Sequence, residues 1–422
     1  MHIDIPYGEC NKSFDLPESR LSWIISPKEV AGVPDEEAEI LHAIRNPIGS
    51  PTLAELVAQK GRGTVILVDD ETRATPQKRV LPLLLNELNR AGVADEEITI
   101  LIALGTHRYM TEEECLLRFG AEVMDRVEVI NHAFDDPSQL VTVGETASGI
   151  PISVNRRYHE SDISIAVGNI IPHIYAGWAG GGKMVQPGVC GSETTAATHL
   201  AAASVVPQIL ATLDNPIRKE IDEVAQRSGL TMIVNTVLNS QSRIVKVVAG
   251  HVVEAFRAGV REAEPIYTVK IREYPDIVIA SSYPADLDLW QAAKALIHGA
   301  LMTREGGTLI LVTPCPEGVA TQHPIVLELG DASPAQVQGK MKRMKPADLI
   351  GAATHMAIGA VRDRVKVVVV SDGLKEEEMR GLGFQYAPDL EEALKAALAR
   401  HGAGAKVGVL THGGDVAPLG TV

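Results

Sequence analysis

The 422-residue chain contains only four cysteines, Cys10, Cys115, Cys190 and Cys315. Long stretches separate them, and none forms a CxxC pair, the spacing typical of cysteine zinc sites and redox pairs. A disulfide framework is not supported either, because such frameworks occur in short secreted chains. We therefore expect reduced thiols and no metal bound by cysteine.

Long apolar runs and blocks of basic residues are also missing. No uninterrupted apolar stretch is long enough to span a bilayer, and the start, MHIDIPYGEC, has neither the basic nor the apolar region of a signal peptide. The formal net charge is -15, with no cluster of Lys and Arg that could form the footprint of a nucleic-acid binder. We expect a cytoplasmic protein without membrane or nucleic-acid partners.

Short β-branched runs recur along the chain, and they are apolar throughout rather than alternating. This pattern is typical of strands that are covered on both faces. The runs span 64–70, 97–104, 127–132, 162–169, 231–238 and 244–251, then 275–282, 307–314, 365–372 and 405–414. Helical periodicity lies between several of them, as in 75–92. The alternation predicts an α/β fold with mostly parallel sheets.

The length of the chain allows two domains. The segment 262–276 contains two prolines and has weaker apolar periodicity, so the boundary is predicted there, with domains 1–268 and 269–422. Each domain should hold a mostly parallel, helix-covered sheet, with the active site in the cleft between them. The sequence leaves open whether the glycine-rich end, 411–422, folds back onto the first domain.

Polar residues gather directly after four of the predicted strands. In open parallel sheets, ligands bind beyond the carboxyl ends of the strands, so these loops are the candidate site. The loops carry Asp69, Asp70, Thr72 and Arg73; His107 and Arg108; His173 and Lys183; and Trp290, Gln291 and Lys294. Spaced three apart on a predicted helix, Gln291 and Lys294 can face the same cleft.

Each of these residues also has a structural explanation. Arg73 could form a surface ion pair, Asp70 could cap a helix, and Lys294 could be a solvated helix residue. The histidines His107 and His173 could be turn or core residues. Their convergence on the edge where an α/β fold binds its ligands favours the functional interpretation.

The run IIPHIYAGWAGGGKMVQPG, residues 170–188, matches GxxxxGK at Gly177, Gly182 and Lys183. A P-loop needs Ser or Thr next to hold magnesium, but Met184 stands there. The acidic strand 64–70 also precedes the glycine loop instead of following it. A P-loop-like phosphotransferase is therefore only an alternative hypothesis.

A lysine held against a ligand by a glycine loop can form a covalent bond with that ligand. Further along, His199 lies in a predicted helix that begins near Ser192. This residue could be a half-buried helix histidine, or its neutral imidazole could supply one metal ligand.

Several segments together resemble the nickel-dependent lactate racemase family of 2-hydroxyacid racemases and epimerases. They match the family in order and spacing over nearly the whole chain. The matching segments are DETR at 70–73, GTHR at 105–108, PH at 172–173, GGGKMVQPGVCGSETTAATH at 180–199 and YPADLDLWQAAKAL at 283–296.

The resemblance implies a nickel-pincer cofactor, a pyridinium mononucleotide with two sulfur-containing arms, attached to Lys183 as a thioamide. Nickel would be held by the two sulfurs, a ring carbon and His199. The other residues implied in cofactor binding are Asp70, Thr72, Gly181 and Gly182. The glycines would let the flat ring lie close to the backbone.

The resemblance also implies a racemase or epimerase that moves hydride from C2 of a 2-hydroxy acid to the cofactor and back. His107 and His173 would be the two acid/bases, and Arg73 and Lys294 would hold the substrate carboxylate. Gln291 would polarise a substrate oxygen. Cofactor-synthesis or loading proteins are implied as partners, and a non-catalytic relative that binds a sugar acid or a nucleotide is a third hypothesis.

Two positions depart from the pattern expected for the family: Ala74 replaces a proline and Trp290 a tyrosine. Because Trp290 belongs to the implied substrate site, the substrate side chain stays open. Lactate, malate, a longer or aromatic 2-hydroxy acid and a sugar acid all remain candidates.

Overall fold

The computed structural model describes residues 1–206 and 208–419 and contains two six-stranded sheets. The first has the strand order β13-β12-β9-β4-β5-β6. All its pairs are parallel except β12 with β13. Its strands are β4 (Thr64–Val68), β5 (Ile98–Ile102), β6 (Glu128–Asn131), β9 (Ile163–Asn169), β12 (Met232–Leu238) and β13 (Ile244–Gly250).

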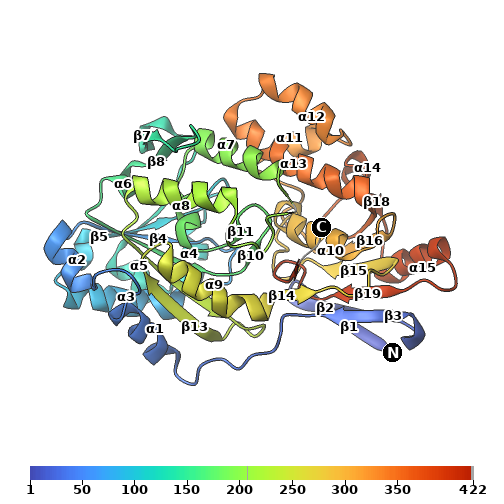
Figure 1. Ribbon diagram of the computed structural model, residues 1–422, viewed down its shortest axis with the longest axis horizontal. Helices are drawn as coiled ribbons and strands as arrows, with labels where there is room; N and C mark the ends of the chain where they lie inside the picture. The colour runs from blue at the N-terminus through green and yellow to red at the C-terminus, as the bar shows by residue number, and fades with distance from the viewer. Residues whose placement is uncertain (207, 420–422) are drawn as a thin grey trace.

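The second sheet has the order β18-β17-β16-β15-β19-β3 and is parallel throughout. Its strands are β3 (Leu21–Ile25), β15 (Ile277–Ser281), β16 (Thr308–Val312), β17 (Lys366–Val370), β18 (Gln385–Tyr386) and β19 (Val407–Leu410). In Figure 1 the two sheets lie side by side, the first on the left and the second on the right.

Helices flank both sheets, as the α/β pattern predicts (Figure 1). Those of the first half are α1 (Glu36–Arg45), α2 (Leu53–Lys60), α3 (Gln77–Arg90), α4 (Glu112–Phe119), α5 (Ala121–Arg126), α6 (Arg156–His159), α7 (Ser192–Ala203), α8 (Pro216–Ser228) and α9 (Glu254–Tyr267). Those of the second half are α10 (Leu289–Met302), α11 (Ile325–Glu328), α12 (Pro334–Lys340), α13 (Pro346–Arg364), α14 (Glu376–Gly381) and α15 (Leu390–His401).

Four two-stranded sheets complete the fold. They pair β1 (His2–Tyr7) with β2 (Cys10–Asp15), β7 (Leu140–Glu145) with β8 (Pro151–Asn155), β10 (Pro172–His173) with β11 (Gly177–Trp178), and β14 (Thr268–Lys270) with β20 (Ala417–Leu419). The sequence analysis predicts none of these short strands, because each lacks a long apolar run.

The first 25 residues belong with the second sheet. β3 is its edge strand beside β19, and Ile5 and Phe14 of the first hairpin pack into the same core cluster as Val409. Figure 1 shows this dark blue segment on the same side as the red β19 and α15. The division into 1–268 and 269–422 stays a prediction, but the chain begins in the second body, crosses to the first and returns.

The segment 262–276 is not an irregular linker. Its beginning completes α9, and β14 follows at once, pairing in parallel with β20 near the C-terminus. The largest apolar cluster contains residues from both sheets, including Leu67 of β4 and Leu311 of β16. The two halves therefore share one continuous core.

All ten predicted strands are present, which confirms the α/β class with mostly parallel sheets. No helix in residues 1–206 or 208–419 has both the length and the apolar character needed to cross a lipid bilayer.

Candidate active site

A cavity lies beyond the carboxyl ends of β4, β5 and β9, and α7, α10 and α13 supply the rest of its wall. It therefore collects residues from both halves of the chain. The predicted site residues that line it are Asp70, Arg73, His107, His173, Lys183, His199, Trp290, Gln291 and Lys294. Three others, Thr72, Gly181 and Gly182, are not among the described residues that line it.

The orientation of His107 is fixed by a buried carboxylate. Its Nδ1 lies 2.5 Å from Oδ2 of Asp70, whose Oδ1 accepts hydrogen bonds from the backbone and hydroxyl of Thr72. Burial alone would raise the pKa of Asp70, but the charge and hydrogen bond of His107 and the charge of Arg73 outweigh it and hold that pKa below its usual range. The carboxylate stays ionised, so Nδ1 of His107 carries a proton and Nε2 has the free lone pair.

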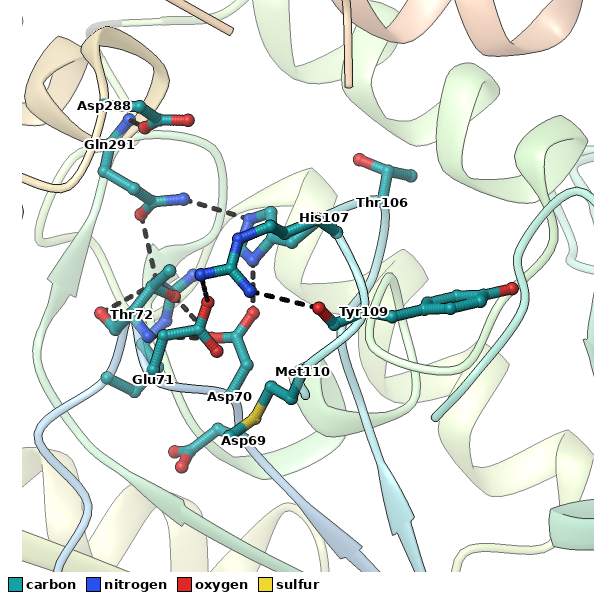
Figure 2. A network of polar contacts seen from close by, with 12 residues as sticks. Asp69, Asp70, Glu71, Thr72, Thr106, His107, Tyr109, Met110, Asp288 and Gln291 are labelled. Carbon is teal, nitrogen blue, oxygen red and sulfur yellow. Dashed lines mark hydrogen bonds and ion pairs between the residues drawn. The ribbon is translucent and has the colours of Figure 1, made fainter. Parts of the chain in front are cut away.

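Gln291 connects this histidine to two cations. Its Nε2 donates to Nε2 of His107 at 3.0 Å, and its Oε1 accepts from Arg73 and from Lys294, each at 3.1 Å. Figure 2 shows Gln291 extending toward both His107 and the loop that follows β4. The amide thus joins the candidate base to the groups that could hold an anion.

His173 has the opposite hydrogen-bonding arrangement. Its Nδ1 accepts the backbone N–H of Tyr175 at 3.1 Å, so the ring proton is on Nε2. Burial lowers its pKa well below the usual value, and the charges of Lys183 and Lys294 lower it further. The structure therefore pairs His107, whose Nε2 accepts a hydrogen bond, with His173, whose Nε2 carries the ring proton.

Lys183 and His199 line the same cavity, and both favour their neutral forms. Burial and the neighbouring charges of Arg73, Lys294 and Arg218 lower the pKa of Lys183 well below its ordinary value. Burial and the charge of Lys183 lower the pKa of His199 to about 4. A neutral amine is a nucleophile, and a neutral imidazole is a metal ligand.

The tautomer of His199 suits metal binding. Its Nδ1 donates to the carbonyl of Thr195 at 2.9 Å, which leaves the Nε2 lone pair available. No group of three or more His, Cys, Asp or Glu residues in residues 1–206 and 208–419 could hold a metal ion by itself.

The glycine loop is held from behind by residues that sequence reasoning missed. Arg218, buried in α8, donates to the carbonyls of Gly180 and Trp178, and Asn235 of β12 accepts the N–H of Gly181 at 2.8 Å. Asn235 could have been identified from the sequence, because it is a polar residue inside the apolar run 231–238. Arg218 carried no signal, because charged residues are common on helices.

Gly181 and Gly182 are required for packing against the helices behind the loop. Gly181 has φ +59, and a Cβ there would lie 2.9 Å from the ring of Phe256 on α9. A Cβ on Gly182 would lie 3.0 Å from Ala225 on α8. Among the glycines of this loop, Gly180 is one that lines the cavity. Their predicted role beside a cofactor ring stays a prediction.

The C-terminal segment also approaches the site. The carbonyl of Gly413 accepts from His298 of α10 at 2.8 Å, and Asp415 lies near enough to Lys294 for each charge to affect the pKa of the other. Burial raises the pKa of Asp415, and burial with the charge of Arg73 lowers that of Lys294. The sequence did not indicate this contact.

Comparisons with known proteins identify the family of this chain. Residues 7–211 match the family model described as the lactate racemase N-terminal domain, and residues 271–417 match the lactate racemase C-terminal domain. The chain belongs to the lactate racemase family. It is therefore an enzyme of the isomerase class, which confirms the resemblance and contradicts the phosphotransferase alternative.

Two curated relatives are named lactate racemase. The protein from Thermoanaerobacterium thermosaccharolyticum is 29% identical over 98% of this chain and 98% of its own length. The protein from Lactiplantibacillus plantarum is 29% identical over 97% and 98%, respectively. The similarity is thus spread over nearly the whole of each chain.

Solved structures show the same fold. The lactate racemase apoprotein from Thermoanaerobacterium thermosaccharolyticum matches with a TM-score of 0.88 at 29% identity, covering 100% of both chains. A protein from Thermotoga maritima matches with a TM-score of 0.73 at 21% identity, over 92% of this chain and 99% of its own. At that identity, the second match supports the fold alone.

The packing of the glycine loop predicts that Gly181→Ala destabilises the protein even without a cofactor. The matched control is Gly149→Ala, since Gly149 has φ +83 but no atom within 4 Å of the place that an added methyl group would take. The control should cost about 1 kcal/mol for its backbone conformation. Gly181→Ala should cost roughly a further 1–3 kcal/mol for overpacking against Phe256. Chemical denaturation measures both, and equal losses would contradict the packing explanation.

Proposed function

We propose that this protein inverts C2 of a 2-hydroxy acid. The observation that carries the proposal is the pairing, in one cavity, of His107, whose Nε2 accepts a hydrogen bond, and His173, whose Nε2 carries a proton. Inversion through a planar 2-keto acid needs a group that takes the hydroxyl proton from either enantiomer and a group that returns it. Two histidines that differ in which of them carries the Nε2 proton are suited to both tasks.

The substrate carboxylate would bind to Arg73 and Lys294. Both side chains line the cavity, and both already donate to the same amide oxygen of Gln291, which occupies the position of an acceptor between them. A carboxylate oxygen in its place would form stronger, charge-assisted hydrogen bonds. Gln291 would then be free to donate to the substrate oxygen at C2.

The side chain of the substrate is the part of the proposal that a screen must decide. The curated relatives are named for lactate. Here the wall of the cavity includes Trp290, which stacks on His323 with ring centroids 4.3 Å apart. Lactate, malate, a longer or aromatic acid and a sugar acid are the candidates to screen.

The residues present fit a nickel-pincer nucleotide. Lys183 offers an amine whose buried surroundings favour the neutral form, which suits covalent attachment. His199 offers one imidazole ligand, and the described residues supply no complete metal site. When bound, such a group accepts the C2 hydrogen with its electron pair and gives it back to either face. Asp70 and Thr72, predicted to bind the cofactor, also hydrogen-bond each other and so can order this wall.

Attachment of the cofactor predicts a covalent adduct on Lys183. We expect protein made in cells supplied with nickel and the cofactor-building enzymes to carry a nucleotide-sized mass increase and roughly one nickel per chain. Lys183→Ala should lose both. Intact mass and metal analysis measure this without any assay of activity.

The matched control is Lys294→Ala, because Lys294 lines the same cavity but is assigned to substrate. It should keep the adduct and the nickel. An adduct that persists in Lys183→Ala would contradict the tether. An unmodified wild-type chain, under conditions that load a known family member, would contradict the proposed cofactor.

Return of the same hydrogen to C2 predicts inversion without isotope exchange. When the loaded enzyme acts on one enantiomer in deuterium oxide, the product should retain protium at C2, because this hydrogen never becomes a solvent-exchangeable proton. Proton NMR of the opposite enantiomer measures the retention. Deuterium at C2 in most product molecules would indicate deprotonation at carbon and exclude the hydride mechanism.

The environment of Lys294 predicts a pH-dependent KM. Its pKa is lowered by burial and by Arg73, so it loses its charge at a lower pH than an ordinary lysine as the pH rises. We expect KM for the acid to increase between about pH 6 and about pH 9. Lys294→Arg should flatten this increase, because arginine stays charged. An unchanged pH dependence in that variant would show that another group is responsible.

A further inference from the structure

Three consecutive residues of the loop after β5 each bond to the second half of the chain. Thr106 Oγ1 lies 2.9 Å from Nε2 of His323, and Nε2 of His107 accepts from Gln291 at 3.0 Å. Arg108 Nη2 donates to Oε1 of Glu317 at 2.6 Å. The middle residue of the three is the histidine proposed as acid/base, while His323 and Glu317 have no role in the proposed chemistry.

Arg108 and Glu317 are joined by several hydrogen bonds. Arg108 Nε also donates to both carboxylate oxygens of Glu317, at 3.0 and 3.1 Å. Nη1 and Nη2 of the same guanidinium donate to the carboxylate of Glu114 at 2.9 and 2.7 Å. Arg108 and Glu317 are both half-buried, and these hydrogen bonds hold the arginine side chain in one orientation.

His323 acts through hydrogen bonding and stacking, not through charge. It is only 4% exposed, and burial together with the charges of His107 and His199 lowers its pKa to about 3. One edge of its ring meets Thr106, and its face stacks on Trp290 at an interplanar angle of 21°. A neutral ring in this position joins the loop after β5 to the helix that carries Trp290.

Glu317 and His323 lie on one segment, residues 315–323, which we call the bridging loop. Its backbone is bound to the start of α10 by three hydrogen bonds: Glu317 N to Leu287 O, Leu289 N to Gly318 O and Trp290 N to Val319 O, each at 3.0 Å. The bridging loop is therefore attached to the start of the helix that carries Trp290, Gln291 and Lys294.

We propose that Glu317 and His323 are positioning residues for His107. Asp70 orients the imidazole within the first half, but it cannot set the distance from that ring to the groups on α10. The bridging loop sets this distance, because it hydrogen-bonds to Thr106 and Arg108 on either side of His107 and is itself fixed to α10. The proposal rests on the proposed acid/base role of His107.

The hydrogen bond between Thr106 and His323 is tested by a double-mutant cycle. His323→Phe keeps an aromatic ring against Trp290 and removes the hydrogen bond from one end, and Thr106→Val removes it from the other. We expect each change to lower kcat of the loaded enzyme by roughly tenfold or more with little change in KM. The double variant should be no slower than the slower single variant.

The ion pair is tested with Glu317→Ala and Glu317→Gln. Glu317→Ala should lower kcat and speed hydrogen exchange of the backbone in residues 104–110, whereas Glu317→Gln should recover part of both, because its amide oxygen still accepts from Arg108. The matched control is Asp95→Ala, which removes a similarly half-buried pair with Arg126 far from this loop. That control should leave kcat and the exchange of residues 104–110 unchanged.

The outcomes separate the two proposals. Multiplicative effects in the cycle, or folded variants with wild-type kcat and exchange, would overturn the positioning role while the wild type still racemises its substrate. A fall in kcat equal to that of Asp95→Ala would also overturn it, as a general loss of stability. A loaded wild type that inverts no 2-hydroxy acid would overturn the proposed function, and with it the need to position His107.

Discussion

The site depends on the crowding of three cationic side chains, Arg73, Lys183 and Lys294, around one cavity with limited access to water. Like charges at short range in a low dielectric cannot all persist, so the groups that can release a proton do so. Burial and this repulsion lower the pKa values of both lysines and of His173 and His199. Arginine keeps its charge. On the proposed function, this repulsion favours the neutral amine of Lys183 for attachment and the neutral imidazole of His199 for metal binding, while Arg73 stays charged for the substrate carboxylate.

The architecture is arranged so that neither half can build this site alone. The first sheet supplies Asp70, His107, His173 and Lys183 from loops at the carboxyl ends of its strands, the place where parallel sheets expose backbone and polar groups. Trp290, Gln291 and Lys294 come from α10, which packs on the second sheet. A shared apolar core fixes the two sheets side by side, and the chain passes from the second sheet to the first after β3 and returns after α9. Hydrogen bonds between the two halves, such as that from Gln291 to His107, then need to make only small changes in the positions of the site residues.

Much of this could be predicted from the sequence, because buried parallel strands have a strong signal. Each of the ten short apolar runs is a strand, and the loops after four of them carry the residues that meet in the cavity. The prediction failed where the signal was short or single. The hairpin at 2–15 has partly apolar strands, and nothing marked β3 as an edge strand of the distant second sheet. Glu317 and His323 are isolated residues in a loop, and their partners lie some two hundred positions earlier, so only the folded chain brings them together.

Gln291 shows how the pieces act together. In the structure its amide nitrogen donates to Nε2 of His107, the atom to which a substrate hydroxyl would donate. Its amide oxygen accepts from Arg73 and Lys294, the two donors that a substrate carboxylate would need. On the proposed function, substrate must therefore replace both sets of bonds at once. A hydroxyl alone would exchange one neutral hydrogen bond for another and gain little, whereas a carboxylate exchanges neutral bonds for charge-assisted ones. Both exchanges involve the side chain of Gln291. The free energy gained at the carboxylate therefore releases His107 from its hydrogen bond with Gln291. The site thus selects acids whose hydroxyl is next to the carboxylate.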